Sequence, residues 1–169
     1  MSTRTRIRVW LWIFIVGLIF SGITAFPLES ELKAFAGFIH ADANAVTSGF
    51  AAWIVRVRDG LIDTNARYPF LAYGTDWLAF AHLVIAVAFF GPLRDPVRNV
   101  WVVEFGIIAC VMVIPLALIA GPVRGIPFGW RLIDCSFGVI GMAPLWFCRR
   151  EIKRLEAETA GADGAPVLP

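Results

Sequence analysis

The stretch VWLWIFIVGLIFSGITAF, residues 9–26, decides the fold of this chain because it is apolar throughout and carries no charge. A helix needs about 20 mostly apolar residues to cross the hydrocarbon core of a bilayer. Arg4, Arg6 and Arg8 precede the stretch, as they would in a signal peptide. However, the apolar run is longer than a usual signal core, and no small-x-small cleavage site follows it. The sequence therefore favours a retained first membrane span over a cleaved leader.

Three further apolar stretches have the length and composition of membrane spans. They cover residues 76–90, 99–120 and 132–148. The first is followed by Gly91-Pro92 and the second by Gly121-Pro122. Because proline cannot continue the hydrogen-bond ladder of a helix, both dipeptides predict helix ends.

The composition agrees with a membrane location. Of the 169 residues, 59% are hydrophobic and 17% are charged, and the mean hydropathy is +0.73. Soluble domains average about 45–50% apolar and about 25% charged residues. These values argue against a disordered protein, a nucleic-acid module and a disulfide-rich secreted domain. We expect an all-α bundle of four transmembrane helices in one domain, residues 1–150. The tail, residues 151–169, is expected to be charged, with a short helix, and then disordered over its last ten residues, 160–169.

The distribution of Lys and Arg predicts the orientation. Positive residues are enriched in the short cytoplasmic flanks of membrane spans. The N-terminus, the link between the second and third spans, and the tail together carry Arg4, Arg6, Arg8, Arg94, Arg98, Arg149, Arg150, Lys153 and Arg154. We therefore expect both termini in the cytoplasm and residues 28–75 on the outer side.

The outer segment, residues 28–75, is too polar to span a membrane. Its apolar residues recur at alternating steps of four and three: Leu32, Ala36, Ile39, Ala43, Val46, Phe50, Trp53 and Val57. This spacing predicts an amphipathic helix, or two shorter helices because Gly49 weakens the middle, followed by a connector over residues 60–74. Such a segment either lies in the membrane interface or caps the bundle.

Ionisable residues inside spans are costly in lipid, which makes them candidates for functional sites. His82 shares a helix face with alanines, and Asp134 shares one with glycines at i+4 and i+7. Small residues allow close helix packing, so both side chains are expected to face the bundle interior. Four further residues are placed to join them on the outer side: Asp76, His40, Arg124 and Arg131.

Each of these polar residues also has a structural interpretation. Asp134 would pair with Arg131 to fix the preceding loop, and His82 would be a hydrogen-bonded packing residue. Glu104 lies about 7 Å from the cytoplasmic end of the third span. We expect it to snorkel into an ion pair with Arg94, Arg98 or an N-terminal arginine.

Residues 70–148 resemble VanZ-like proteins, a family of small multi-span bacterial membrane proteins. The matching pieces are TDWLAFAHLV (75–84), VVEFG (102–106) and GPVRGIPFGWRLIDCSFGVIGMAPL (121–145). Family members place the Asp and His of the first piece four residues apart, whereas this chain places them six apart. The resemblance implies a role in the bacterial cell envelope and a location in the inner membrane, without an established reaction. It carries over to Asp76, His82, Glu104, Asp134, and either Arg124 or Arg131.

These features predict an envelope protein whose outward-facing polar pocket recognises or processes an amphiphilic anionic ligand, a lipid head group or a lipid-linked glycan. Arg124, Arg131 and His40 would bind the ligand, since arginine holds phosphate and carboxylate groups by forked hydrogen bonds. The candidates for catalysis are His82, Asp134 and Asp76, with His82 as a general base if chemistry occurs.

No spacing typical of a metal site or a phosphate-binding loop is present in the sequence, so we expect no metal and no cofactor. The expected partners are membrane lipid and a second membrane protein or a second copy of this chain, and not nucleic acid. Two other functions stay open. One is a non-catalytic accessory subunit that packs on a partner membrane protein, and the other is a small proton-coupled transporter.

Overall fold

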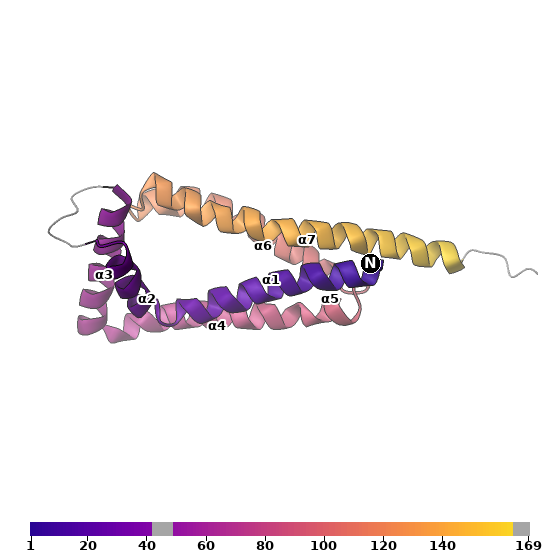
Figure 1. Ribbon diagram of the computed structural model, residues 1–169, viewed down its shortest axis with the longest axis horizontal. Coiled ribbons are helices and arrows are strands. Elements are labelled where there is room, and N and C mark those ends of the chain that lie inside the picture. Colours follow the sequence, from indigo (N-terminus) through magenta and orange to yellow (C-terminus); the bar gives the residue numbers. More distant parts are fainter. Residues whose placement is uncertain (42–48, 164–169) are drawn as a thin grey trace, which may run out of the picture. The chain divides into compact units, whose positions relative to one another are not determined.

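The computed structural model describes residues 1–41 and 49–163 (Figure 1). Within these two ranges the chain is helical and forms no strand, which confirms the predicted all-α class. Its elements in chain order are α1 (Thr3–Ala25), α2 (Leu28–Phe38), α3 (Gly49–Arg67), the 3-10 turn η1 (Pro69–Leu71), α4 (Ala72–Ala88), α5 (Phe90–Arg94), α6 (Val100–Val123) and α7 (Phe128–Asp163).

Four helical stretches of the described chain are long and apolar enough to cross a membrane, as predicted. They are Thr3–Ala25, Pro69–Arg94, Val100–Val123 and Phe128–Ala160. Only 22–28% of the apolar window of each stretch is buried by the protein itself. An apolar surface that stays exposed to this extent in four long helices is typical of a chain surrounded by lipid.

The two Gly-Pro dipeptides do not end their helices where the sequence predicts. Gly91 and Pro92 lie in the first turn of α5, where a proline is tolerated because the first N–H groups of a helix need no partner. Gly121 and Pro122 lie inside the last turn of α6, which ends at Val123. There Gly125 adopts a left-handed φ of +68°, and Ile126 N–H donates back to the Gly121 carbonyl. A glycine in this conformation closes a helix C-terminus, so Gly125 ends α6.

The fourth span and the tail form one helix. α7 continues without a break past Cys148 through the charged residues to Asp163. The charged helical part of the tail is therefore confirmed. The prediction of disorder over residues 160–169 is wrong for residues 160–163, because helical hydrogen bonding propagates from the preceding turns. Residues 164–169 lie outside the described residues.

The segment after the first span forms two helices, α2 and α3, as predicted for a chain weakened at Gly49. The predicted connector over residues 60–74 is wrong, because α3 continues through Gly60 to Arg67 and α4 begins at Ala72. The predicted apolar stripe is correct at Ala36, which is buried, but α3 buries Ile54 and Val55 instead of Phe50. The stripe positions Ala43 and Val46 lie outside the described residues.

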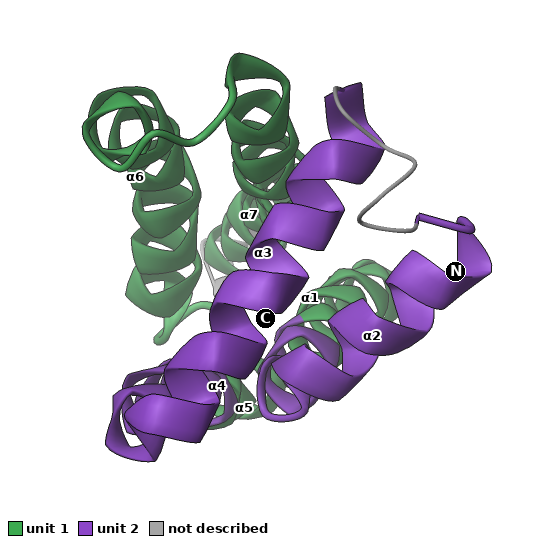
Figure 2. Cartoon of the chain, turned by 90° about the vertical axis from the view of Figure 1, so that its left-hand side faces the viewer, with its two compact units in different colours: residues 1–17, 86–169 green, residues 18–85 purple. Residues whose placement is uncertain are grey.

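The chain divides into two compact units, coloured green and purple in Figure 2. Unit 1 comprises residues 1–17 and 86–169, and unit 2 comprises residues 18–85. The single domain over residues 1–150 stays a prediction, and each unit is described by itself below.

Unit 1 is built on close packing of α6 against α7, and Phe89 packs beside them. Gly138 of α7 contacts the backbone of α6 so closely that a Cβ atom would lie within 3.0 Å of the Cys110 carbonyl oxygen. A Cβ on Gly106 would lie 2.7 Å from Leu145 and 2.8 Å from Phe89. Glycines at these positions bring two helix backbones together, which is the usual way helices associate in lipid.

Unit 2 joins the second half of α1 to α4 and packs α2 on α3. Gly22 of α1 lies against α4, where a Cβ would be 2.9 Å from the Ala79 carbonyl oxygen. Ala36 and Ile54, both 1% exposed, are buried in α2 and α3, and Phe35 meets Phe50 edge-on at 6.4 Å. The amphipathic helices therefore bury apolar side chains within their own unit.

Candidate functional site

Unit 2 contains a pocket of about 310 Å³ between the link that follows α1 and the beginning of α4. The first turn of α2, the last turns of α3, and η1 also contribute to its wall. Half of its lining is polar: Glu29, Ser30, Thr64, Asn65, Thr75 and Asp76. The other half is apolar and includes Phe26, Leu28, Leu61 and Leu71. Among the described residues no lysine or arginine lines the pocket, so its charge is negative.

Glu29 connects the helices that form this pocket. Asn65 of α3 donates a hydrogen bond of 2.6 Å to one oxygen of the Glu29 carboxylate, and Lys33 pairs with the other oxygen. These two donors, Lys33 first, lower the pKa of Glu29 below its ordinary value of 4.5. Glu29 is therefore a charged residue with a partner at each carboxylate oxygen: Lys33 within α2 and Asn65, which joins α2 to α3.

Asp76 is the second carboxylate of the pocket and differs from Glu29 in having no partner. It is half-buried, and no described residue forms a hydrogen bond or an ion pair with its side chain. A carboxylate that is partly shielded from water and lacks a protein donor is available to accept hydrogen bonds from a ligand. Asp76 was predicted as a site residue, and the structure places it in a pocket.

His82 lies on the same helix, about 9 Å further along α4, and does not line the pocket. As predicted, its face packs on α1: its Cβ lies beside Gly22, and the neighbouring Ala79 is fully buried. Its Nδ1 lies 2.8 Å from the Leu78 carbonyl oxygen. A carbonyl oxygen only accepts, so Nδ1 donates and the neutral ring keeps Nε2 as an acceptor. These contacts agree with the structural interpretation of His82.

His40 lies just beyond the end of α2 and is exposed. Its φ of +51° places it in the left-handed region. The N–H of His40 donates to the Gly37 carbonyl and that of Ala41 to the Ala36 carbonyl. This pair of bonds is the Schellman arrangement that closes a helix C-terminus. His40 therefore ends α2, and it does not line the pocket that contains Asp76.

The predicted ion pair between Asp134 and Arg131 is not formed among the described residues. The Arg131 side chain instead packs against Gly121 of α6, and its guanidinium lies 5.1 Å from the centre of the Phe128 ring. Its Nε is buried without a hydrogen-bond partner. Asp134 is half-buried one turn further along α7, on the face where Gly138 contacts α6. Cation–π contact and packing on a glycine thus replace the expected pair.

The predicted site residues belong to different units. Arg124, exposed at the end of α6, lies in unit 1 with Arg131 and Asp134. His40, Asp76 and His82 lie in unit 2. The convergence of all six residues on one pocket therefore stays a prediction, and the pocket described above contains one of them.

The predicted partners of Glu104 are wrong. The Glu104 carboxylate pairs with Arg149 of α7 at 2.8 Å, and not with Arg94 or Arg98 among the described residues. Because α6 and α7 pack along their lengths, they bring these two residues to the same level. The sequence already showed Arg149 near the same end of the bundle, but only the packing of α6 on α7 selects it.

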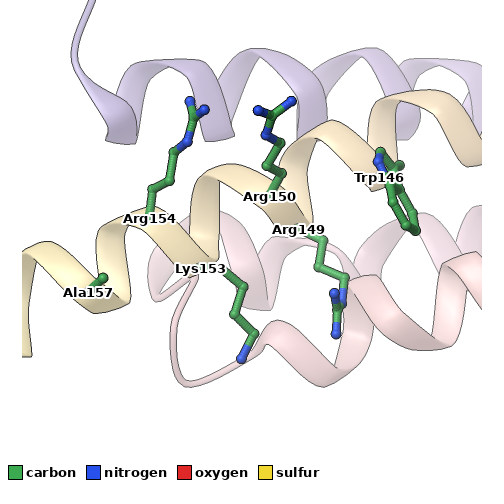
Figure 3. Close-up of a pocket in the computed structure, with 6 residues that line it drawn as sticks. All are labelled: Trp146, Arg149, Arg150, Lys153, Arg154 and Ala157. Atoms are coloured by element: carbon green, nitrogen blue, oxygen red, sulfur yellow. The ribbon is translucent and has the colours of Figure 1, made fainter.

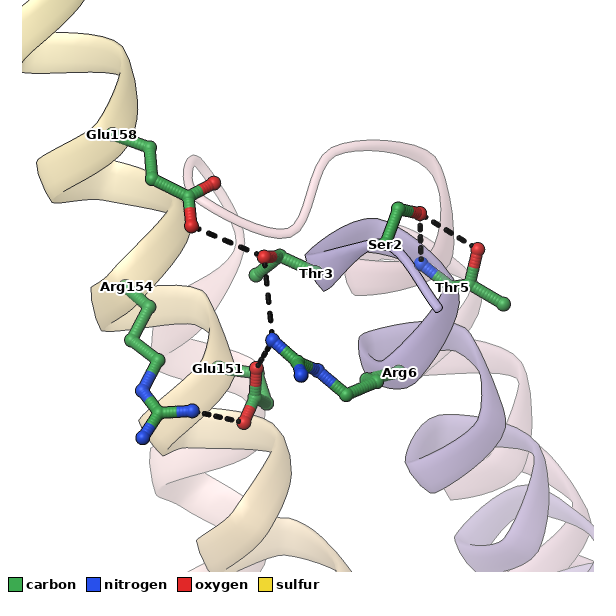
Figure 4. A network of polar contacts seen from close by, with 7 residues as sticks. All are labelled: Ser2, Thr3, Thr5, Arg6, Glu151, Arg154 and Glu158. Atoms are coloured by element: carbon green, nitrogen blue, oxygen red, sulfur yellow. Dashed lines mark hydrogen bonds and ion pairs between the residues drawn. The ribbon is translucent and has the colours of Figure 1, made fainter.

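A second network in unit 1 was missed from the sequence. Glu151, which is only 8% exposed, forms ion pairs with Arg6 and Arg154, both at 2.9 Å, and accepts a hydrogen bond from Arg154 (Figure 4). Thr3 of the N-terminus donates to Glu158 in the same region. The spacing of Glu151 and Arg154 at i and i+3 could have indicated that pair. The contact with Arg6 could not be read from the sequence, since it depends on how α1 packs on α7.

The fold and these sites define a class: a multi-pass, all-α membrane protein with a polar pocket beside the ends of two spans. No group of three or more His, Cys, Asp or Glu side chains in the described ranges could hold a metal ion. Comparison of the chain with family models, with curated proteins and with solved structures gave no match.

Proposed function

We propose that this multi-pass membrane protein binds the hydroxyl-bearing head group of a membrane amphiphile, such as a lipid-linked glycan, in the pocket of unit 2. The observation that carries the proposal is Asp76, a half-buried carboxylate without a protein partner in a pocket of about 310 Å³. Hydroxyl groups donate hydrogen bonds to carboxylate and amide oxygens, and the polar half of this pocket has two carboxylates, Glu29 and Asp76, and one side-chain amide, Asn65.

The position of the pocket supports an amphiphile over a water-soluble ligand. One candidate span ends at Ala25 and the next begins at Pro69, so the pocket lies beside two span ends. There a head group would meet Asp76 and Asn65 while its acyl chains stay in lipid. The apolar wall, with Phe26 and Leu71, would contact the part of the ligand nearest the membrane.

The pocket of unit 2 has no lysine or arginine among its described lining residues that could hold an anionic group. In unit 1, considered by itself, Arg131, with its buried and unsatisfied Nε, and the exposed Arg124 stay candidates for binding an anionic group. Two arginines suit phosphate and carboxylate groups. The bacterial envelope, the inner membrane and cytoplasmic termini are parts of the same proposal, supported by the positive residues at three of the span flanks and by the VanZ-like resemblance.

A second candidate function is an accessory subunit, and exposed apolar surface favours it. α6 presents Ile108, Met112, Leu116 and Ile119 on one face, each at least 59% exposed. A partner membrane protein would cover such a face. Chemical cross-linking in native membranes, followed by mass spectrometry, would give cross-links from this face to a different protein.

Native mass spectrometry of the protein purified in mild detergent tests the main proposal. We expect a discrete adduct on the wild-type protein that is lost in Asp76→Asn, which keeps the size of the side chain and removes its charge. Asp63→Asn is the matched control, because Asp63 is exposed on α3 and, within the described part of the chain, pairs only with Arg67. An adduct that survives in Asp76→Asn, or is lost equally in both variants, would contradict the proposal.

A further inference from the structure

A second hollow, of about 430 Å³, lies along α7 in unit 1 and is separate from the pocket of unit 2. Six residues of α7 line it, at helical spacings of three and four: Trp146, Arg149, Arg150, Lys153, Arg154 and Ala157. Figure 3 shows Arg150 and Arg154 extending to one side of the helix, and Arg149 and Lys153 to the other. We call these four cations and Trp146 the α7 basic cluster.

The charges of the α7 basic cluster are only partly neutralised. Arg149, Arg154 and Lys153 each have a carboxylate partner, namely Glu104, Glu151 and Glu156. Arg150 is exposed and has no carboxylate partner among the described residues. Each guanidinium carries five N–H donors, so the paired arginines keep donors for a further anion. The cluster can therefore accept one negatively charged group beside Arg150.

The position of the cluster along α7 indicates how deep it would lie in a bilayer. The apolar part of the helix ends with Trp146, Phe147 and Cys148, and Trp146 is 58% exposed. Tryptophan is enriched at the level of lipid head groups, and arginines at helix ends extend toward the same level. Arg150 lies one turn beyond Trp146, about 6 Å along the axis. This is the depth at which the phosphates of a bilayer lie.

We propose that the α7 basic cluster is a binding site for the phosphate of an anionic phospholipid. Arg150 makes the first contact with the phosphate, Arg154 on the same side of the helix adds donors, and the acyl chains run beside Trp146. The charge of the cluster complements an anionic head group, and the exposed indole favours a phosphate that is attached to acyl chains. Clusters of Lys and Arg next to a span recognise anionic lipids through this combination of charge and depth.

Lipid retention measured by native mass spectrometry tests this site, with phosphatidylglycerol and phosphatidylcholine offered at equal concentration. We expect the wild-type protein to retain phosphatidylglycerol preferentially. Arg150→Gln with Arg154→Gln should lower the apparent affinity for phosphatidylglycerol by about fivefold for each cation removed. Arg150→Lys keeps the charge and should keep most of the binding. Unchanged circular dichroism and melting temperature would show that the exposed substitutions leave the fold intact.

Arg94→Gln with Arg98→Gln is the matched control. It removes the same charge at the same end of unit 1, between α5 and α6, but outside the α7 basic cluster. We expect the apparent affinity for phosphatidylglycerol to change less than twofold in this control. If both double variants lose the same affinity, the attraction is diffuse and the proposed site is overturned. Equal retention of both lipids would also overturn it. Displacement of the lipid by millimolar inorganic phosphate would show a site for a free anion, which contradicts the proposed occupant.

Discussion

The two compact units use their polar residues differently. In unit 1 the carboxylates Glu104 and Glu151 meet arginines across helices, at 2.8 and 2.9 Å. In unit 2 Glu29 is held by Lys33 and Asn65, but Asp76 lines a pocket without a partner among the described residues. Most of these carboxylates already have protein partners, so their charge alone gives no reason to expect a ligand beside them. Asp76, without a partner among the described residues, is free to accept hydrogen bonds in its pocket, which is why the proposal rests on it.

Helix packing in unit 1 depends on glycine, and its loss should give the largest effect on stability. In Gly138→Ala the new Cβ would meet the Cys110 carbonyl oxygen, which belongs to the backbone and cannot move cheaply. We expect the free energy of unfolding to fall by about 3 kcal/mol, which is typical of severe overpacking. Unfolding in mixed micelles of mild detergent and SDS measures this free energy.

Gly17→Ala is the matched control for that experiment, because nothing lies within 4 Å of a Cβ at Gly17. It should stabilise α1 by up to about 1 kcal/mol, the usual gain from alanine in a helix interior. Losses of similar size at both glycines would mean that the contact between α6 and α7 is not the cause.

The Glu151 network should give the next largest effect. Glu151→Gln leaves Arg6 and Arg154 without their shared carboxylate, whose side chain is 11% exposed. We expect the free energy of unfolding to fall by about 2 kcal/mol. This is less than for a fully buried ion pair, because both arginines reach water. Glu156→Gln, at the exposed pair with Lys153, should cost less than about 0.5 kcal/mol in the same unfolding assay.

The end of α2 allows a gain in stability in unit 2. His40 has a left-handed φ of +51°, which costs an L-residue about 1 kcal/mol and costs glycine nothing. We expect His40→Gly to stabilise the protein by about 1 kcal/mol, as measured by chemical unfolding. If His40 instead contributes to ligand binding, the same variant would lose the adduct seen by native mass spectrometry.

The smallest expected effect is the pH dependence contributed by Glu29. Its pKa is lowered in the folded protein by donors from Lys33 and Asn65. The stabilisation is therefore present above the ordinary value of 4.5 and is lost as the pH falls through the folded pKa. Glu29→Gln should flatten the stability curve on this acidic side. A curve of unchanged slope between pH 6 and about 3 would contradict the role of these donors.

Most of the fold could be predicted from the sequence because lipid imposes strong constraints on composition and length. Four spans, two amphipathic helices and the charged helical tail all follow from runs of apolar residues and their spacing. The helix ends were less predictable. Gly-Pro is compatible with the first or the last turn of a helix as well as with its end, so Pro92 and Pro122 gave no reliable boundary.

The candidate site could be predicted only in part. Asp76 was predicted because it lies on the outer side near His82 and because the VanZ-like resemblance carries over to it, whereas Asn65 and Glu29 belong to helices where polar residues are ordinary. The i,i+4 spacing of Glu29 and Lys33 is typical of a helix, but it does not indicate a pocket. The partner of Glu104 depends on the register of α6 against α7, which is set by glycine contacts between residues far apart in the chain.

Native mass spectrometry of Asp76→Asn in unit 2 and Asp134→Asn in unit 1, from the same mild detergent, tests the proposed pocket most directly. Both substitutions remove one half-buried carboxylate and keep its size. We expect the head-group adduct to be lost from Asp76→Asn and kept by Asp134→Asn. Loss from Asp134→Asn with full retention by Asp76→Asn would place the ligand in unit 1 and contradict the proposed pocket in unit 2.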